Sequence, residues 1–285
     1  MFSLFFRGLA TGSIYSLTAV GIVLILSTTN VMNFAQGDMG MILAFIAFVL
    51  LMSKMPYIVA VIVIIIIGII LGYFLEKGIM SRIRKTSHIA MVMITLALTM
   101  IFEGIVGIFV QTPLLFPAAI PGPPVILKGV VMDRQDLLSL GAALFVVTTL
   151  FLALYRTKIG IASRSLAEDE YAAKLMGIPV KNIYIFIWST SFGLAGLAGI
   201  MVAPRLSLEP TFMVVVQLKA FIAAVLGGMN SVVGAVIGGL LLGVIENFVS
   251  FYIPQIKDSF SLILVVIVLL FLPQGLFGKK ETRRA

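Results

Sequence analysis

The feature that most constrains this chain is a succession of apolar segments, each about twenty residues long, that runs almost from end to end. Twenty residues of α-helix rise about 30 Å, which is the thickness of the hydrocarbon core of a bilayer. The mean hydropathy of +1.18 and the 61% share of hydrophobic residues lie far outside the composition of a soluble domain. The sequence therefore predicts a membrane protein, and its 285 residues leave no room for a sizeable soluble domain.

Nine apolar segments are expected to form the membrane helices. They lie at about residues 8–27, 34–52, 56–75, 89–110, 137–155, 183–203, 211–228, 232–252 and 259–276. The segment 211–228 is the weakest, because Gln217 and Lys219 interrupt it, and a broken or partly re-entrant helix is the alternative there. The predicted fold class is all-α: a polytopic helical membrane protein with about eight or nine transmembrane segments, some broken or re-entrant, in a single domain 1–285.

Lysine and arginine gather in three connections between these segments. They are Lys77, Arg82, Arg84 and Lys85 in the first, Arg156, Lys158, Arg164, Lys174 and Lys181 in the second, and Lys279, Lys280, Arg283 and Arg284 in the third. Cytoplasmic loops of membrane proteins carry an excess of basic residues, so all three connections are expected in the cytoplasm. Nine crossings then place the N-terminus outside and the C-terminus in the cytoplasm.

The stretch 111–136 is expected to be an irregular extracytoplasmic cap and not a helix, because it contains five prolines. Such a surface is suited to receive a partner protein. The alternative is a loop that only covers the bundle.

Most enzyme classes are excluded by the absence of cysteine and by a single histidine, His88. A thiol nucleophile or a Cys/His metal cluster cannot be built from this chain, so no catalytic residue, metal or cofactor site is expected in it. The run Gly227-Gly-Met-Asn-Ser231 lacks the Gly-Lys-Ser/Thr of a phosphate loop, so no nucleotide site is expected either. No nucleic-acid partner is expected, and the apolar surface predicts contact with membrane lipid.

The connection 156–182 has the signals of a short helix outside the membrane. Ser165 and Glu168 form a capping-box pattern that predicts its start. Gly177 supplies a C-cap, and Pro179 prevents the helix from continuing.

Apolar side chains between these signals are suited to fill a groove on another protein. The candidate docking residues of this helix are Ser165, Glu168, Asp169, Ala172, Leu175, Met176 and Gly177. An interfacial helix that lies on the lipid headgroups is the alternative.

Polar residues and glycines interrupt the hydrophobic run between the first two spans, at residues 30–40. Broken helices of this kind expose backbone groups to a permeating solute, so Asn33, Gln36 and Asp38 are candidates for the translocation pathway. The alternative is that Asn33 and Asp38 cap the second helix at the membrane edge.

Four pairs of glycines spaced four residues apart predict close helix packing in lipid. They are Gly8 and Gly12, Gly68 and Gly72, Gly234 and Gly238, and Gly239 and Gly243. They indicate a compact bundle and carry no function of their own.

Four motifs, in order along almost the whole chain, resemble a known family. They are Gly12-Ser-Ile-Tyr-Ser-Leu through Asn33-Phe-Ala-Gln-Gly-Asp38, Ala167-Glu-Asp-Glu-Tyr-Ala-Ala-Lys-Leu-Met-Gly-Ile178, Val225-Leu-Gly-Gly228 through Gly234-Ala-Val-Ile-Gly-Gly239, and Pro273-Gln-Gly-Leu-Phe-Gly278. Together they resemble the branched-chain amino acid ABC transporter permeases, in the LivH-like branch.

The resemblance implies a non-catalytic permease subunit of an importer in the bacterial inner membrane. Its partners would be a second homologous permease, two cytoplasmic ABC ATPase subunits that bind ATP and Mg, and an extracytoplasmic solute-binding protein. The resemblance also implies that residues 165–178 form the coupling helix that docks on an ATPase, within the cytoplasmic coupling loop 156–182.

Two questions stay open from the sequence. Relatives of this branch are associated with branched-chain amino acids, urea, short amides and aromatic acids, so the resemblance does not select one substrate. The competing function is an ion-coupled secondary transporter or a channel, in which Asp38, Glu103 or Glu246 binds an ion.

Overall fold

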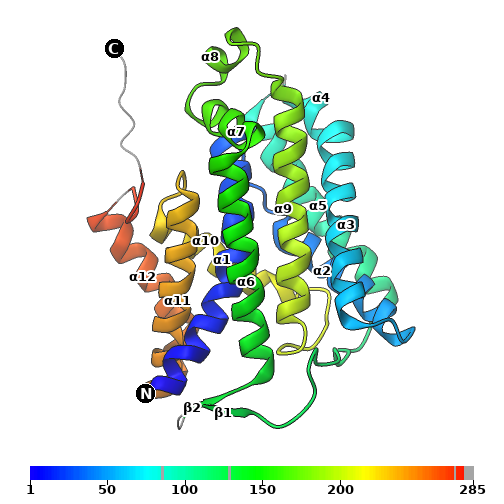
Figure 1. The fold of residues 1–285 in the computed structure, drawn as a ribbon, viewed down its shortest axis with the longest axis vertical. Helices are drawn as coiled ribbons and strands as arrows, with labels where there is room; N and C mark the ends of the chain where they lie inside the picture. The colour runs from blue at the N-terminus through cyan, green and yellow to red at the C-terminus, as the bar shows by residue number, and fades with distance from the viewer. Residues whose placement is uncertain (85–86, 128–129, 273, 279–285) are drawn as a thin grey trace.

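The computed structural model describes residues 1–84, 87–127, 130–272 and 274–278, and it is a bundle of long helices (Figure 1). The long helices are α1 (Phe2–Thr29), α2 (Gln36–Met52), α3 (Tyr57–Leu75), α5 (His88–Phe109), α6 (Arg134–Arg156), α9 (Val180–Val202), α10 (Phe212–Gly227), α11 (Val232–Tyr252) and α12 (Lys257–Phe271). The short elements are a π-helical turn (Glu76–Met80), α4 (Ser81–Ile83), α7 (Lys158–Glu168), α8 (Glu170–Leu175) and a 3₁₀ turn (Pro254–Ile256).

Each of the nine apolar segments predicted from the sequence coincides with one long helix. Within the described residues, six helices are long and apolar enough to cross a membrane, and α2, α10 and α12 are shorter apolar helices. The all-α polytopic class is confirmed, while the count of eight or nine crossings stays a prediction. The helix α10 is continuous over 16 residues, so the alternative of a broken helix inside 211–228 is wrong, and whether this short helix crosses the membrane fully stays open.

The bundle has two distinct ends (Figure 1). The short helices α4, α7 and α8 lie at one end, which we call the α8 end, and the N-terminus lies at the other. Two of the three basic connections therefore share the α8 end, as predicted. Lys85, Lys128, Pro273 and the third basic cluster lie outside the described residues.

The described residues of the stretch 111–136, which are 111–127 and 130–136, contain no helix before Arg134, as predicted, but they are less irregular than expected. Strands β1 (Val125–Leu127) and β2 (Val130–Met132) form an antiparallel hairpin with Val125 opposite Met132. These β-branched runs follow the last prolines and are free to pair. Leu114 and Leu208 form a further bridge, with N···O distances of 2.8 and 3.0 Å, that joins this cap to the loop after α9.

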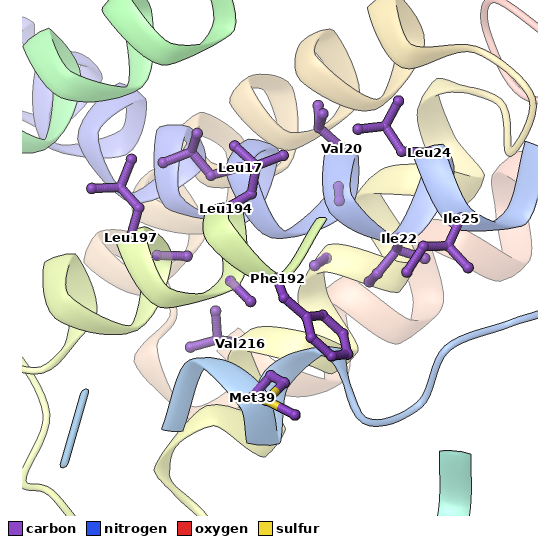
Figure 2. Packing of buried hydrophobic residues seen from close by; sticks show 14 of the residues in the cluster. Leu17, Val20, Ile22, Leu24, Ile25, Met39, Phe192, Leu194, Leu197 and Val216 are labelled. Atoms are coloured by element: carbon purple, nitrogen blue, oxygen red, sulfur yellow. The ribbon is translucent and has the colours of Figure 1, made fainter. Parts of the chain in front are cut away.

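The core is centred on α1 and α9, whose most apolar stretches are each 83% buried. Figure 2 shows apolar side chains from four helices meeting there. The labelled residues are Leu17, Val20, Ile22, Leu24 and Ile25 of α1, Met39 of α2, Phe192, Leu194 and Leu197 of α9, and Val216 of α10. The two central helices therefore set the positions of the helices around them.

Glycines bring the outer helices against this centre, as the four predicted pairs require. A Cβ atom at Gly12 of α1 would lie 2.6 Å from the carbonyl oxygen of Gly239 in α11. A Cβ atom at Gly72 of α3 would lie 2.5 Å from the carbonyl oxygen of Trp188 in α9. Backbones at these points are in contact, so van der Waals packing between helices replaces the hydrophobic drive that lipid cannot supply.

The turn between α10 and α11 is closed by the end of the described chain. Leu276 and Phe277 donate backbone hydrogen bonds to the carbonyl oxygens of Leu226 and Gly227, at 2.8 and 2.9 Å. These are carbonyls of the last turn of α10, which have no partner inside the helix. Gly228, with φ of 109°, lets the two segments approach this closely. The glycine run at 227–228 is thus a packing feature.

We expect Gly12→Ala to lower the free energy of unfolding of the purified protein by about 1–3 kcal/mol, and its melting temperature with it, because the added methyl group overlaps the backbone of α11. Gly141→Ala is the matched control, since a Cβ atom there meets nothing within 4 Å. Thermal unfolding in detergent measures both. Equal melting temperatures for the two variants would contradict the packing described for α1.

Candidate functional site

The connection between α1 and α2, residues 30–35, begins at the exposed Asn30 and ends inside the bundle. Gln36 contacts Ser191, eleven residues beyond the start of α9, and Gln217, which contacts Phe34, is ten residues before the end of α10. At about 1.5 Å per helical residue, both contacts lie about 15 Å inside the α8 end. The connection is therefore non-helical backbone at the depth of the membrane helices, which is the broken-helix alternative.

The backbone groups that this break leaves unpaired are satisfied by side chains from α5 and α10. The Phe34 N–H donates to the hydroxyl of Thr95 at 3.3 Å, and the hydroxyl of Thr99 lies 3.3 Å from the Phe34 carbonyl oxygen. The amide of Gln217 donates to the same carbonyl and accepts from the Gly37 N–H. Irregular backbone is tolerated at membrane depth only when protein supplies such partners.

Asn33 and Gln36 are fully buried and hold the break against α9. The Asn33 amide donates to Oε1 of Gln36 at 3.2 Å, and Nε2 of Gln36 donates to the Ser191 carbonyl at 2.9 Å. The Ser191 hydroxyl lies 2.8 Å from Oε1 of Gln36 and 2.9 Å from the carbonyl of Gly21, so it links three segments. Gly21 makes room for the Gln36 amide, which a Cβ atom would approach to 2.3 Å.

Asp38 lies in the first turn of α2, three residues after Ala35, and it does not act as the helix cap. The cap residue is Ala35, whose N–H donates to Oδ1 of Asn33 at 3.1 Å. Asp38 is 3% exposed, and Thr99 and Glu103 of α5 are within electrostatic range of its carboxylate. The structure thus places Glu103, which the sequence offered only as an ion-binding alternative, on the helix that faces a predicted pathway residue.

Glu246, which has no basic partner on its own helix, pairs with Lys219 of α10. Both side chains are buried, and Lys257 at the start of α12 lies 3.7 Å from the same carboxylate oxygen. The Lys219 ammonium also lies 5.8 Å from the ring centroid of Tyr15 in α1. Ionisable groups inside a membrane protein require such partners, and Lys219 supplies one for Glu246.

A cleft of about 850 Å³ opens at the α8 end, between the last turn of α1, α7 and the turn between α10 and α11. Its lining includes Ser27, Arg164, Asn230 and Phe277. None of the three predicted pathway residues lines it. In this structure they lie below the cleft, within the packed bundle.

The predicted docking helix is divided differently from the expectation. α7 begins after Thr157, whose hydroxyl accepts from the Gly160 N–H at 3.1 Å. Ser165 therefore lies well inside α7, where its hydroxyl donates to the Ile161 carbonyl at 3.1 Å. The capping box predicted from Ser165 and Glu168 is wrong, because Thr157 starts the helix two turns earlier.

A second helix, α8, begins at Asp169, where the backbone is extended. The Asp169 carboxylate accepts from the Ala172 N–H at 2.9 Å and caps this helix. Its end is the predicted one: Gly177 has φ of 77°, and the Ile178 N–H donates to the Ala173 carbonyl at 3.1 Å. This is the Schellman arrangement that a glycine after the last helical turn favours.

The outer face of α8 is apolar and exposed. Tyr171, Leu175 and Met176 are 73%, 72% and 80% exposed, while Ala173 is buried against the bundle. In Figure 1, α8 projects beyond the ends of the long helices. Leu175 and Met176 were predicted from the sequence, and Tyr171 was missed, although its place one turn before Leu175 on the same face is a usable signal.

A bundle of apolar helices with a protein-lined break at membrane depth, and a helix exposed beyond one end, has the architecture of a membrane permease. The sequence matches the family of the branched-chain amino acid transport system, permease component, over residues 4–272. The chain belongs to this family, which confirms the resemblance. It is a multi-pass membrane protein and a permease component of an ABC transport system.

Similar proteins cover nearly the whole chain. The high-affinity branched-chain amino acid transport system permease protein BraD of Pseudomonas aeruginosa is 29% identical, over 98% of this chain and 96% of its own length. The probable branched-chain amino acid transport permease protein LivH of Methanocaldococcus jannaschii is 29% identical, over 92% and 88%. LivH of Escherichia coli is 26% identical, over 98% and 96%.

We expect Ser191→Ala to destabilise the protein by about 1–2 kcal/mol, because Gln36 and Gly21 lose a buried hydroxyl partner. Ser53→Ala is the control, since that hydroxyl, just after the end of α2, is exposed and donates to the nearby Val49 carbonyl. Thermal unfolding of the two variants in detergent provides the comparison. A melting temperature for Ser191→Ala as high as that of the control would show that the break does not depend on this contact.

Proposed function

We propose that this chain is a permease subunit of a binding-protein-dependent ABC importer that carries branched-chain or related small amino acids. The observation that carries the proposal is the family match over nearly the whole chain, together with the exposed apolar face of α8. The named relatives are branched-chain amino acid permeases, which supports this substrate class over urea, short amides or aromatic acids.

The importer would be assembled from several subunits in the bacterial inner membrane. This chain would work with a second homologous permease, two cytoplasmic ABC ATPase subunits and an extracytoplasmic solute-binding protein. ATP and Mg would be bound by the ATPases, and this chain would be non-catalytic. The basic residues at the α8 end support a cytoplasmic position for that end and an extracytoplasmic position for the N-terminus.

Within this importer, α8 would be the coupling helix. Tyr171, Leu175 and Met176 offer an apolar surface of the kind that inserts into a groove of a partner protein. The short α8 is joined to α9, one of the two central helices, by only four residues. A displacement of α8 by an ATPase would therefore be transmitted through this short connection to α9 and the core of the bundle.

The pathway would run beside the break between α1 and α2. Asn33 and Gln36 would position the break, and Asp38 would contribute a carboxylate where α2 meets α5. A neutral zwitterion is suited to a path of backbone dipoles and few charges, and few ionisable groups lie within the membrane helices.

Gly177→Val tests the coupling role. A Cβ atom there meets nothing within 4 Å, so the substitution acts through backbone strain at positive φ, about 1–2 kcal/mol or more for a β-branched residue. We expect Gly177→Val to lose most ATP-driven uptake at a normal level in the membrane, and Gly177→Asn, which tolerates this conformation, to retain it. Normal uptake by the valine variant would count against α8 as the coupling helix.

Uptake of radiolabelled leucine into proteoliposomes tests the whole function. The chain is reconstituted with its co-purifying partners, and ATP and the binding protein are each supplied or withheld. We expect uptake only when both are present. Uptake driven by an ion gradient without ATP would contradict the proposal and indicate a secondary transporter. ATP hydrolysis stimulated by the binding protein without leucine uptake would support an importer whose substrate is not leucine.

A further inference from the structure

A second cleft, of about 610 Å³, lies at the α8 end on the side of α4 and α5. Its walls come from α4, the first residue of α5, α8 and the start of α9. The cleft is lined by four basic residues and one acidic residue. The basic residues are Arg84, His88, Lys174 and Lys181, and the acidic residue is Glu170.

Arg84 is held in place before any ligand arrives. Its guanidinium donates to both carboxylate oxygens of the buried Glu76, at 2.7 and 2.8 Å, and stacks on the Tyr184 ring at 3.6 Å from the centroid. These contacts hold the guanidinium rigid, and the planar fork of a rigid guanidinium is suited to recognise a phosphate or carboxylate oxygen.

Two of the positive charges are paired, Arg84 with Glu76 and Lys174 with Glu170, and Lys181 is the lysine of the cleft that is not, in the part of the chain that the structure describes. Burial alone would raise the pKa of Glu170, but the hydrogen bond and charge of Lys174, 2.6 Å away, hold it below its ordinary value. Glu170 is therefore an ionised partner of Lys174. Lys181 has no ion-pair partner within the described residues, so its charge is available to a ligand.

The cleft lies at the level where the apolar surface begins. His88 is the first residue of α5, and Ile89 and Met93 immediately beyond it are 75% and 60% exposed. Side chains of this kind face acyl chains in a membrane, so the basic groups above them stand at the height of the lipid phosphates. A free phosphate ion has the same oxygen atoms as the headgroup, but it has no apolar part that could contact the exposed face of α5.

We propose that this cleft binds the phosphodiester headgroup of an anionic phospholipid, with Arg84 and Lys181 on its phosphate oxygens and its acyl chains along α5. Because Glu170 and Lys174 of α8 line the same cleft as Arg84, which follows α4, the lipid would lie between the exposed helix and the bundle. Basic pockets at this height on the cytoplasmic side of helical bundles suit such headgroups.

The test is native mass spectrometry of the complex with its co-purifying partners, titrated with phosphatidylglycerol, phosphatidylcholine or inorganic phosphate. We expect phosphatidylglycerol to be retained over phosphatidylcholine, and Lys181→Gln to weaken its retention by about fivefold. Lys158→Gln is the matched control, because Lys158 is exposed on α7 and does not line the cleft. Arg84→Lys keeps the charge beside Glu76 but removes the planar fork, and we expect it to weaken retention as well.

Four results would overturn the proposal. They are equal retention of the two lipids, equal retention of phosphatidylglycerol by Lys181→Gln and Lys158→Gln, displacement of the lipid by millimolar phosphate, and loss of the ATPase subunits from Lys181→Gln with lipid binding unchanged. The third would assign the cleft to free phosphate, and the fourth to a protein contact. The measurement records lipid binding without transport, so its outcome is independent of the proposed function.

Discussion

The absence of water inside a bilayer is the constraint from which the rest of this structure follows. Every backbone group that leaves a helix, and every ionisable side chain, has to find a partner within the protein. The break at residues 30–35 exists because threonines of α5 and Gln217 of α10 supply those partners. Glu246 is present inside the bundle because Lys219 lies opposite it.

The same constraint explains what could be predicted from the sequence. A helix that must satisfy its own backbone in lipid needs about twenty apolar residues, so the spans can be read from hydropathy alone. Glycines spaced four residues apart predicted close packing, and α1 and α11 do meet at Gly12 and Gly239. The pairs of helices that meet could not be predicted, because the glycine spacing identifies the contact face of one helix but not the helix that packs against it.

The candidate site was predictable only where its signals were local. Gly177 ends α8 as predicted, since a positive φ depends on the residue itself and its neighbours. The start was misplaced at Ser165, because a capping pattern inside a longer helix looks the same as one at its beginning. The depth of the break and the neighbourhood of Asp38 and Glu103 depend on contacts between distant segments, which no local pattern contains.

The closure of the α10–α11 turn by residues 274–278 has a consequence for biogenesis. These residues leave the ribosome about fifty positions after the turn that they complete, and α11 and α12 are inserted in between. Until then the last carbonyls of α10 have no partner from the chain terminus. The newly made protein therefore passes through an interval in which α10 and α11 are already made but the turn between them still lacks these two hydrogen bonds.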